Sequence, residues 1–449
     1  MGVGNIEKHS RLFAVLKIFL RLWHDLVFYR KVQYVNREKL PLSDHLIFTP
    51  NHQNALMDAL AIEFSLNNQF VFVARSDIFK NKYIARLLYF FKILPVYRIR
   101  DGYESLKKNE VVFRKTLDII RNKNGFVILP EGNHAGFRRL RPLKKGFARI
   151  AFRAEESEAF SLDMKIVPVG INYSDYEPFR SDLLVIFGEP FPVSGFYDAY
   201  RENPAVAFNQ IKEKLAEEIK PLIINIESAF YDVYDFLRKA YCQKAALQLH
   251  FSPNDLYDRF RAEKAIIARL EQFEANQPGA MEKLALQVNR YQDLLQKMKL
   301  DNIKPVSAKA CFAKAMLLLF AFPLFAYGYL NNFFPWNISL FVSRQIKDPQ
   351  FRSSFKFVVS LLSFPLFYLI QSIAVYGLYH LFWLALAYLV SLPLSAAIAW
   401  NYAKVFRKFV SEWRYLRKKS GKDPRLAEAE EIYHFFMAEM DKIFQIYNA

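Results

Sequence analysis

Two long runs without a charged residue constrain the fold of this chain more than any other feature. Residues 315–343 contain no Asp, Glu, Lys or Arg, and the same is true of residues 357–403. A membrane-spanning helix needs roughly 20 apolar residues, and helices that are apolar on all sides are buried in a core or in lipid. The second run is long enough for two spans, with a turn expected at residues 377–380. We therefore predict helices that lie inside a membrane.

Basic residues beside these runs predict their orientation. Those around the second run are Arg344, Lys347, Arg352 and Lys356 before it, and Lys404, Arg407, Lys408, Arg414, Arg417, Lys418 and Lys419 after it. Because basic flanks stay on the cytoplasmic side, residues 357–403 should form a hairpin of two spans with both ends in the cytoplasm. The run at residues 315–343 contains Asn331, Asn332 and Pro335 and also has basic flanks. For this run, a re-entrant hairpin and a third span are both open.

Hydropathy patterns divide the chain into five regions. They are residues 1–45 with an amphipathic helix, residues 46–225 with an α/β pattern, residues 226–310 with polar accessory helices, residues 311–403 with the membrane segments, and residues 404–449 with a basic cytoplasmic tail and a further amphipathic helix. In the first region, residues 12–29 place apolar and basic residues on opposite helical faces. Such a helix either lies on a membrane or packs on a core.

The region at residues 46–225 alternates short apolar runs with helical patterns. Strands are expected at residues 46–49, 70–74, 93–97, 126–129, 166–171 and 183–187, and helices at residues 55–66, 80–91, 103–122, 145–157 and 205–226. This alternation is typical of an α/β domain with a mostly parallel sheet flanked by helices. In such domains, sites gather beyond the carboxyl ends of the strands.

The charge balance favours an anionic partner. Lys and Arg number 62 against 44 Asp and Glu, giving a formal net charge of +18. The chain has no nucleic-acid motif, so membrane lipids explain the excess better than nucleic acid does. The two cysteines, Cys242 and Cys311, lie far apart with no metal-ligand spacing, so we expect no metal site and a reducing compartment.

A His and an Asp follow the first expected strand, in the stretch "NHQNALMDAL" at residues 51–60. If both were helical, His52 and Asp58 would lie about 120° apart around the axis and could not meet. With His52 in the turn and Asp58 in the first turn of the helix, they can. A His held by a carboxylate has a fixed tautomer and raised basicity, which suits a general base acting on an alcohol. The alternative is a surface His beside an Asp that stabilises the helix dipole.

Basic and polar residues follow the ends of other expected strands. Arg98 and Arg100 lie beyond residues 93–97, at alternate positions of an extended chain, where two guanidinium groups can bind phosphate. Glu131, Gly132, Asn133 and His134 form a loop after residues 126–129, and Lys144 and Lys145 precede the next helix. The start of that helix and the cations together predict an anion site. Pro168 lies inside an expected strand, as a structural residue or a wall of an apolar channel.

Several other chemistries lack their motifs. The sequence contains no G-x-S-x-G elbow, so a covalent acyl-enzyme on serine is not supported. It also contains neither a P-loop nor a G-x-G-x-x-G motif, which argues against a nucleotide-phosphate cradle.

In this order, "NHQNALMD", "LPVYRIR", "LPEGNH" with "LKKG", and "IVPVGI" resemble the four sequence blocks of the glycerolipid acyltransferase family. That family acylates glycerol-3-phosphate, 1-acylglycerol-3-phosphate or related acceptors. The resemblance covers residues 46 to about 190 and implies the family's α/β fold. It further implies that His52 removes the proton from the acceptor hydroxyl and that Asp58 orients His52. The hydroxyl then attacks an acyl thioester directly, which agrees with the missing serine elbow.

The resemblance also implies substrate contacts. Arg98 is similar to a phosphate ligand of the acceptor, Glu131 and Gly132 to the acceptor-binding loop, and Pro168 to a block linked to the acyl side or to structure. Charge and position add Arg100, Lys144 and Lys145 to the expected binding residues. The third block reads Glu-Gly-Asn-His where Glu-Gly-Thr or Glu-Gly-Ser is commoner, so Asn133 and His134 join this set; His134 either adds an acceptor contact or replaces the capping role of that hydroxyl. The expected co-substrate is acyl-CoA or acyl-carrier-protein thioester, with no cofactor. The expected location is a bacterial inner membrane or the endoplasmic reticulum, with the catalytic domain on the cytoplasmic face.

The spacing between His52 and Asp58 departs from the family's usual pattern. Five residues separate them, where most members have four. The longer spacing resembles a branch that acts on glycerol-3-phosphate or dihydroxyacetone phosphate. Two alternatives stay open: transfer to another acceptor, such as an amino-acid lipid, and a membrane lipid-binding relative that has lost catalysis.

Overall fold

The structure, a computed structural model, describes residues 6–97, 103–132, 136–303 and 306–447. Two compact units make up the chain. The first comprises Met1–Asn225 together with Ile346–Phe357, and the second comprises Ile226–Gln345 together with Val358–Ala449. A short segment from the carboxyl-terminal half of the chain is therefore part of the first unit.

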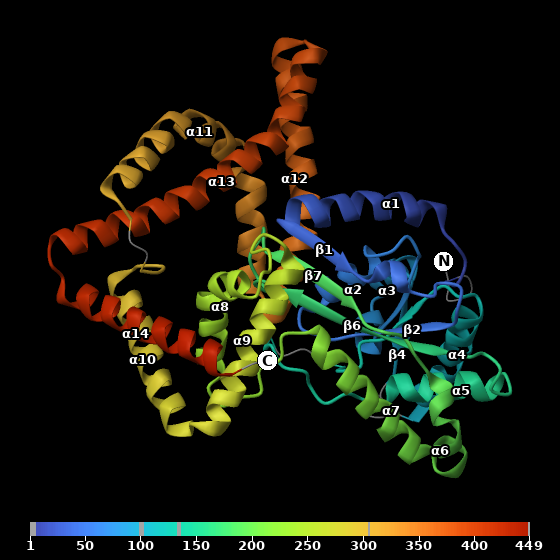
Figure 1. Cartoon of the computed structure of the whole chain (residues 1–449). Helices are drawn as coiled ribbons and strands as arrows, with labels where there is room; N and C mark the ends of the chain where they lie inside the picture. Colours follow the sequence, from blue (N-terminus) through green and yellow to red (C-terminus); the bar gives the residue numbers. More distant parts are fainter. Residues whose placement is uncertain (1–5, 98–102, 133–135, 304–305, 448–449) are drawn as a thin grey trace. The chain divides into compact units, whose positions relative to one another are not determined.

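An eight-stranded sheet forms the centre of the first unit, in the order β1-β7-β6-β2-β5-β3-β4, with β8 beside β6 (Figure 1). The strands are β1 (Lys31–Val35), β2 (Leu46–Pro50), β3 (Val71–Arg75), β4 (Ile93–Val96), β5 (Phe126–Val127), β6 (Lys165–Tyr173), β7 (Asp182–Phe187) and β8 (Phe191–Pro192). Only the pairings of β6 with β7 and with β8 are antiparallel among the described strands. The predicted mostly parallel sheet is confirmed.

Helices pack against this sheet, and their apolar side chains form a hydrophobic core together with those of the strands. They are α2 (Leu56–Glu63), α3 (Lys82–Phe90), α4 (Tyr103–Arg121), α5 (Gly146–Ser157), α6 (Tyr197–Glu202) and α7 (Pro204–Ile219). Apolar side chains of α4, α5 and α7 share one buried cluster with Ile47, Phe126 and Ile166 of the strands. On β2, the next residue, Phe48, is also buried and contacts the ring of Phe70 at 5.0 Å. Because successive strand residues point to opposite faces, both faces of the sheet are covered.

Strand β1 is a difference from the sequence expectation, which placed no strand before residue 46. It pairs in parallel with β7, from Lys31 opposite Asp182 to Val35 opposite Ile186. The strand lies at the edge of the sheet, and its side chains are exposed or half-buried. An edge strand lacks the continuous apolar run of the inner strands, which is why its sequence does not stand out.

Helix α1 (Arg11–Leu22), with a π-helical continuation at Trp23–Phe28, has two different faces. Phe13, Lys17 and Leu20 are buried against the first unit, and Lys17 forms a 2.8 Å ion pair with Glu63 of α2. The opposite face is apolar and exposed, through Leu12, Val15, Ile18, Leu22 and Leu26. The helix therefore packs on the core through one side and presents a second apolar side outward.

Four helices of the second unit pack together: α8 (Tyr231–Gln248), α9 (Leu256–Asn276), α10 (Pro278–Met298) and α14 (Pro424–Ile446). The hydroxyl of Tyr241 in α8 donates to Asp441 of α14 at 2.5 Å. Arg290 of α10 forms an ion pair of 2.7 Å with Glu428 of α14. The carboxyl-terminal helix is thus joined to accessory helices that lie far from it in the sequence, since these two contacts span 200 and 138 residues.

Three further helices are long and apolar enough to cross a membrane: α11 (Ala308–Gln345), α12 (Pro349–Tyr379) and α13 (Phe382–Ser420). The chain turns between α12 and α13 at His380, which has a φ of 53°, close to the expected turn. Helix α11 continues through Pro323 and Pro335 and is bent along its length (Figure 1). For this helix, the re-entrant hairpin and the third membrane span both stay predictions.

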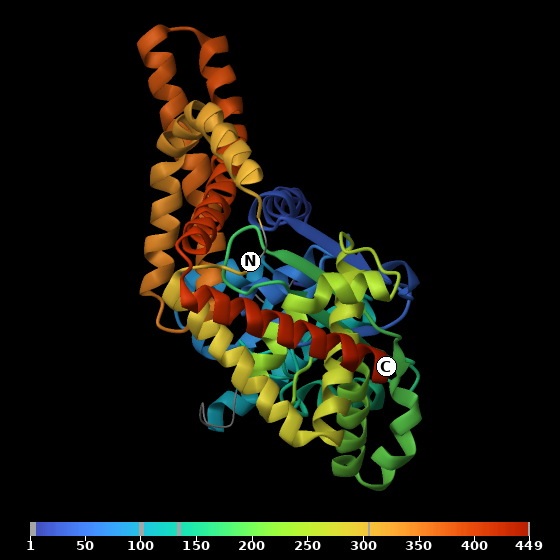
Figure 2. The ribbon, with the colours of Figure 1, turned by 60° about the vertical axis from the view of Figure 1, so that its left-hand side comes forward.

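Polar side chains join α11, α12 and α13 within their apolar surroundings. Asn332 of α11 donates to Ser395 of α13 at 3.2 Å and accepts from the hydroxyl of Tyr368 in α12 at 2.6 Å. Gly328 of α11 lies so close to α13 that an added Cβ would be 2.3 Å from the Ser395 carbonyl oxygen. Small residues and shared hydrogen bonds are the usual means of joining helices in lipid. Figure 2 shows the same helices from a second direction.

Candidate active site

The site begins where β2 ends. Pro50 is the last residue of the strand, and the backbone N–H of Asn51 still donates to Val169 of β6 at 3.2 Å. The Asn51 side chain then continues the hydrogen bonding to β6. Its Nδ2 donates to the Ile171 carbonyl at 3.1 Å, and its Oδ1 accepts from the Ile171 N–H at 2.6 Å. The turn that follows is therefore anchored to the centre of the sheet.

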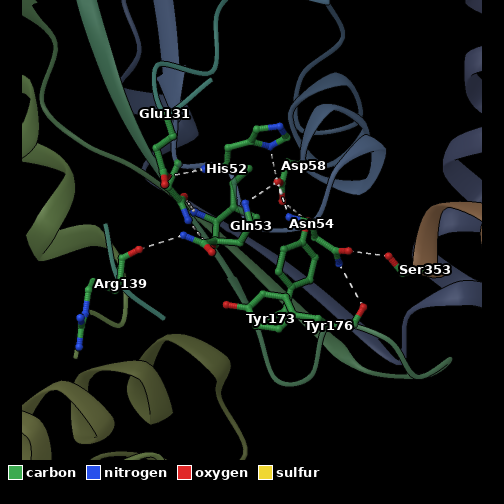
Figure 3. Close-up of polar contacts among 11 residues, drawn as sticks. His52, Gln53, Asn54, Asp58, Glu131, Arg139, Tyr173, Tyr176 and Ser353 are labelled. Atoms are coloured by element: carbon green, nitrogen blue, oxygen red, sulfur yellow. Dashed lines mark hydrogen bonds and ion pairs between the residues drawn. The ribbon is translucent and has the colours of Figure 1, made fainter. Parts of the chain in front are cut away.

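His52 lies in this turn and contacts Asp58. Its Nδ1 is 2.9 Å from Asp58 Oδ2, and the His52 side chain is 17% exposed while that of Asp58 is fully buried (Figure 3). Asp58 is the third residue of α2 and also accepts the backbone N–H groups of Gln53 and Asn54, at 2.8 and 2.7 Å. With Nδ1–H directed at the carboxylate, Nε2 becomes the nitrogen that can take up a proton.

A fourth donor completes the surroundings of Asp58. The hydroxyl of Tyr173, the last residue of β6, donates to Asp58 Oδ1 at 2.8 Å. Burial raises the pKa of Tyr173 well above its usual value, so its hydroxyl stays protonated and remains a donor. Four hydrogen-bond donors therefore converge on the Asp58 carboxylate. The arrangement supplies the negative partner that a protonated imidazole needs.

The conformation of Ala55 accommodates the longer spacing between His52 and Asp58. Ala55 precedes α2 and has a φ of 45° and a ψ of −122°. Residues other than Gly rarely adopt a positive φ. In this turn His52 Nδ1 and the backbone N–H groups of Gln53 and Asn54 all contact Asp58 Oδ2. The His–Asp contact therefore forms with five residues between the two side chains.

Glu131 joins a second loop to the His52 turn. Its Oε1 accepts the backbone N–H of His52 at 2.7 Å, and its Oε2 accepts the N–H of Arg141 at 3.2 Å. The side chain is buried, and burial raises the pKa of Glu131 to about 7. Through these two hydrogen bonds, the Glu131 carboxyl group joins the backbone at His52 to the backbone at Arg141. The role in acceptor binding that the resemblance implies stays a prediction.

The basic segment after Glu131 is attached to the same turn. Gln53 Nε2 donates to the Arg139 carbonyl at 3.1 Å (Figure 3). Lys144 donates its backbone N–H to the Pro130 carbonyl at 2.7 Å, its side chain is exposed, and Lys145 is half-buried at the start of α5. Cationic side chains thus follow the loop that holds His52. Gly132 has a φ of 65°, which favours glycine.

The remaining expected residues divide into two groups. Arg98, Arg100, Asn133 and His134 lie outside the residues that the structure describes. Pro168 is buried within β6, where it pairs with Thr49 of β2 and accepts the Gly188 N–H at 2.9 Å. Within the described ranges, no group of three or more His, Cys, Asp or Glu is placed to hold a metal ion.

Sequence reasoning missed several residues around His52. Tyr173 does not stand out in the sequence because it follows the apolar run at residues 166–171, although strand alternation places Ile171 and Tyr173 on one face. The Asn54 side chain donates to the Tyr176 carbonyl at 3.2 Å. Ser353 of α12 donates to Asn54 Oδ1 at 2.5 Å. No sequence pattern connects Ser353 to a turn some 300 residues earlier.

Residues 31–172 match the family model described as Acyltransferase. Glycerol-3-phosphate O-acyltransferase 2 of Saccharomyces cerevisiae is 22% identical over 295 residues, which are 59% of this chain and 38% of the yeast protein. Glycerol-3-phosphate O-acyltransferase 1 of the same yeast is 30% identical over 113 residues, which are 25% of this chain and 15% of that protein. The matches therefore span well under half of either relative.

Among solved structures, the 1-acyl-sn-glycerophosphate (LPA) acyltransferase of Thermotoga maritima aligns with a TM-score of 0.31 and 18% identity, over 49% of this chain and 79% of that one. The region that matches the family model contains the whole His52 turn, Asp58 and Glu131. Residues 31–172 are therefore identified as an acyltransferase domain.

Proposed function

We propose that this chain is a membrane-bound O-acyltransferase of phospholipid biosynthesis. It transfers a fatty acyl group from an acyl thioester to a hydroxyl of glycerol-3-phosphate or 1-acylglycerol-3-phosphate. The observation that carries this proposal is the contact of His52 Nδ1 with the buried carboxylate of Asp58, at 2.9 Å, in the turn after β2. The similarity to two yeast glycerol-3-phosphate O-acyltransferases supports the choice of acceptor.

In the proposed reaction, His52 Nε2 accepts the proton of the acceptor hydroxyl as its oxygen attacks the thioester carbonyl carbon. The new C–O bond forms, the C–S bond breaks, and the thiolate leaves and takes up the proton from the imidazolium. Asp58 stabilises the imidazolium between these steps without taking its proton. General base catalysis of this kind contributes about 10²- to 10⁴-fold to a rate. No enzyme nucleophile is needed.

Cationic residues near the turn would bind the phosphate of the acceptor. Lys144 and Lys145 precede α5, and the backbone of the basic segment is attached to Gln53. Arg98 and Arg100, which lie outside the residues that the structure describes, are proposed as further phosphate ligands from their sequence alone. A guanidinium or ammonium group can pair with phosphate oxygens. The free phosphate monoester would thereby be distinguished from an uncharged glycerol.

Three apolar helices and the outer face of α1 support attachment to a membrane. The helices α11, α12 and α13 each have the length and composition of a span, and Leu12, Val15 and Leu22 of α1 are 68%, 68% and 52% exposed. We propose that the catalytic domain lies on the cytoplasmic side, where the basic flanks would remain. Alkaline carbonate extraction should leave the chain in the membrane pellet. Release into the soluble fraction would contradict membrane integration.

The acceptor is tested with the purified full chain in detergent. Labelled acyl-CoA or acyl-carrier-protein thioester is offered with glycerol-3-phosphate, 1-acylglycerol-3-phosphate, dihydroxyacetone phosphate and an amino-acid lipid, and products are identified by mass spectrometry. We expect ester formation with one of the first two. Turnover with the amino-acid lipid alone would contradict the proposed acceptor, and no turnover with any of them would favour a lipid-binding relative that has lost catalysis.

A further inference from the structure

The first turns of α12 contact the turn that carries His52. The Ser353 hydroxyl donates to Asn54 Oδ1 at 2.5 Å, and both residues are 1% exposed (Figure 3). The other end of the Asn54 amide donates to the Tyr176 carbonyl at 3.2 Å, while the Asn54 backbone N–H donates to Asp58 Oδ2 at 2.7 Å. Asn54 therefore connects Ser353 to the carboxylate that holds His52.

Other contacts keep this part of α12 in place. Lys356 Nζ donates to the Glu177 carbonyl at 3.0 Å, and Arg352 forms an ion pair of 3.5 Å with the Glu177 side chain. The ring of Phe357 is buried and lies 5.3 Å from that of Phe28. These contacts do not involve the Ser353 hydroxyl. Loss of that hydroxyl should leave the segment attached to the first unit.

We propose that Ser353 is a positioning residue for acyl transfer. It fixes the Asn54 side chain, and thereby holds the backbone N–H groups of residues 53 and 54 against Asp58 and keeps His52 aligned with the acceptor hydroxyl. The role rests on the proposed function, and Ser353 itself touches neither substrate nor the reacting atoms. The start of an apolar helix from the carboxyl-terminal half thus completes the support of the catalytic turn.

The neighbouring residue provides a matched control. Ser354 is also buried, at 5% exposure, but its hydroxyl has no hydrogen-bond partner among the residues that the structure describes. Ser353→Ala and Ser354→Ala remove the same atom from adjacent positions of the same helix. Only the first removes a contact to the His52 turn. A general effect of altering α12 would appear in both variants.

The kinetic test uses the full chain in detergent with acyl-CoA and glycerol-3-phosphate or 1-acylglycerol-3-phosphate. Ser353→Ala should lower kcat about tenfold, as expected for one lost buried hydrogen bond that matters in the transition state, and change the KM for acyl-CoA less than twofold. Ser353→Thr, which keeps the hydroxyl, and Ser354→Ala should retain kcat within about twofold. Equal losses in Ser353→Ala and Ser354→Ala would overturn the proposal.

A double variant tests whether Ser353 acts through Asn54. Asn54→Ala should lower kcat, and adding Ser353→Ala to it should lower kcat no further, because the hydroxyl then has no partner to fix. If the two losses multiply, Ser353 acts by another route and the proposal is wrong.

A second measurement does not depend on turnover. Hydrogen exchange followed by mass spectrometry should show faster exchange, by about tenfold, in peptides covering residues 51–60 of Ser353→Ala. The same peptides of Ser354→Ala should match the wild type. Unchanged exchange in Ser353→Ala would overturn the positioning role even in an active enzyme. If the wild type shows no acyl transfer but residues 51–60 still exchange faster in Ser353→Ala than in the wild type, the structural link is upheld and the proposed function is contradicted.

Discussion

At the scale of single residues, the Tyr173 hydroxyl tests the importance of the Asp58 surroundings. It donates to Asp58 Oδ1 at 2.8 Å, from the end of a strand whose residues 166–171 are apolar. Tyr173→Phe removes this donor and should lower kcat about tenfold, since a hydrogen bond to a charged group contributes more than one between neutral groups. Steady-state acyl transfer measures the effect.

Tyr34→Phe is the matched control for this prediction. The Tyr34 hydroxyl is buried and has no hydrogen-bond partner within the described part of the chain. Its removal should leave kcat within about twofold of the wild type. A loss of similar size in both variants would show that Tyr173 acts only through general packing.

Glu131 makes a prediction about stability and pH. Burial raises its pKa from 4.5 to about 7, so between these values the folded chain keeps a proton that the unfolded chain has released. The contribution of Glu131 to the free energy of unfolding is therefore full below about pH 4.5, falls as the pH rises, and is lost above about pH 7. Glu131→Gln should gain on the wild type, on the order of 1 to 3 kcal/mol, between pH 5 and pH 8.

Thermal unfolding of both proteins in the same detergent at pH 5 and pH 8 measures this difference. Other titrating groups, including Glu63, whose pKa burial also raises to about 7, are common to both proteins and cancel. If the melting temperatures of the two proteins differ by the same amount at pH 5 and at pH 8, the pKa of Glu131 is not raised as described.

At the scale of elements, the turn between β2 and α2 depends on the backbone of Ala55. Its φ of 45° is accessible to Gly and strongly disfavoured for a β-branched residue. Ala55→Gly should change the free energy of unfolding by less than about 1 kcal/mol and keep activity, while Ala55→Val should cost about 2 kcal/mol or more and lower kcat. Thermal unfolding and acyl transfer measure the pair. Equal tolerance of Gly and Val would contradict this backbone conformation.

The contact of α11 with α13 gives a second prediction at this scale. A Cβ at Gly328 would meet the Ser395 carbonyl oxygen at 2.3 Å, whereas one at Gly377 of α12 would meet nothing within 4 Å. Gly328→Ala should therefore lower the melting temperature in detergent by several degrees, and Gly377→Ala should leave it unchanged or raise it slightly. If both substitutions are tolerated equally, the two helices do not pack closely at Gly328.

Most elements of the first unit could be predicted from the sequence because inner strands are continuous apolar runs. The strand expected at residues 166–171 is β6 (Lys165–Tyr173), and the helix expected at residues 145–157 is α5 (Gly146–Ser157). The edge strand β1 lacks this pattern. The His52 turn could be placed by its position after a strand, but its closure depends on a positive φ at Ala55, which an alanine does not indicate.

At the scale of the whole molecule, the two units do not follow the order of the chain. The regions expected from hydropathy run consecutively, whereas residues 346–357 belong to the unit that contains the sheet. A hydropathy pattern depends only on composition. The basic residues of this segment, Arg352 and Lys356, therefore indicate the flank of a membrane span and not a part of the unit that contains the sheet. Its contact with Asn54 arises only from tertiary packing. A resemblance that stops near residue 190 also gives no information about it.

The central claim is that His52 acts as the base for acyl transfer to a phosphorylated glycerol. Initial rates of the purified full chain with labelled acyl-CoA and glycerol-3-phosphate or 1-acylglycerol-3-phosphate test it most directly, compared with His52→Ala and with His434→Ala on the exposed side of α14. We predict a loss of at least about 10²-fold in His52→Ala and wild-type rates in His434→Ala. Full activity of His52→Ala, or no ester formed by the wild type with either acceptor, would contradict the account.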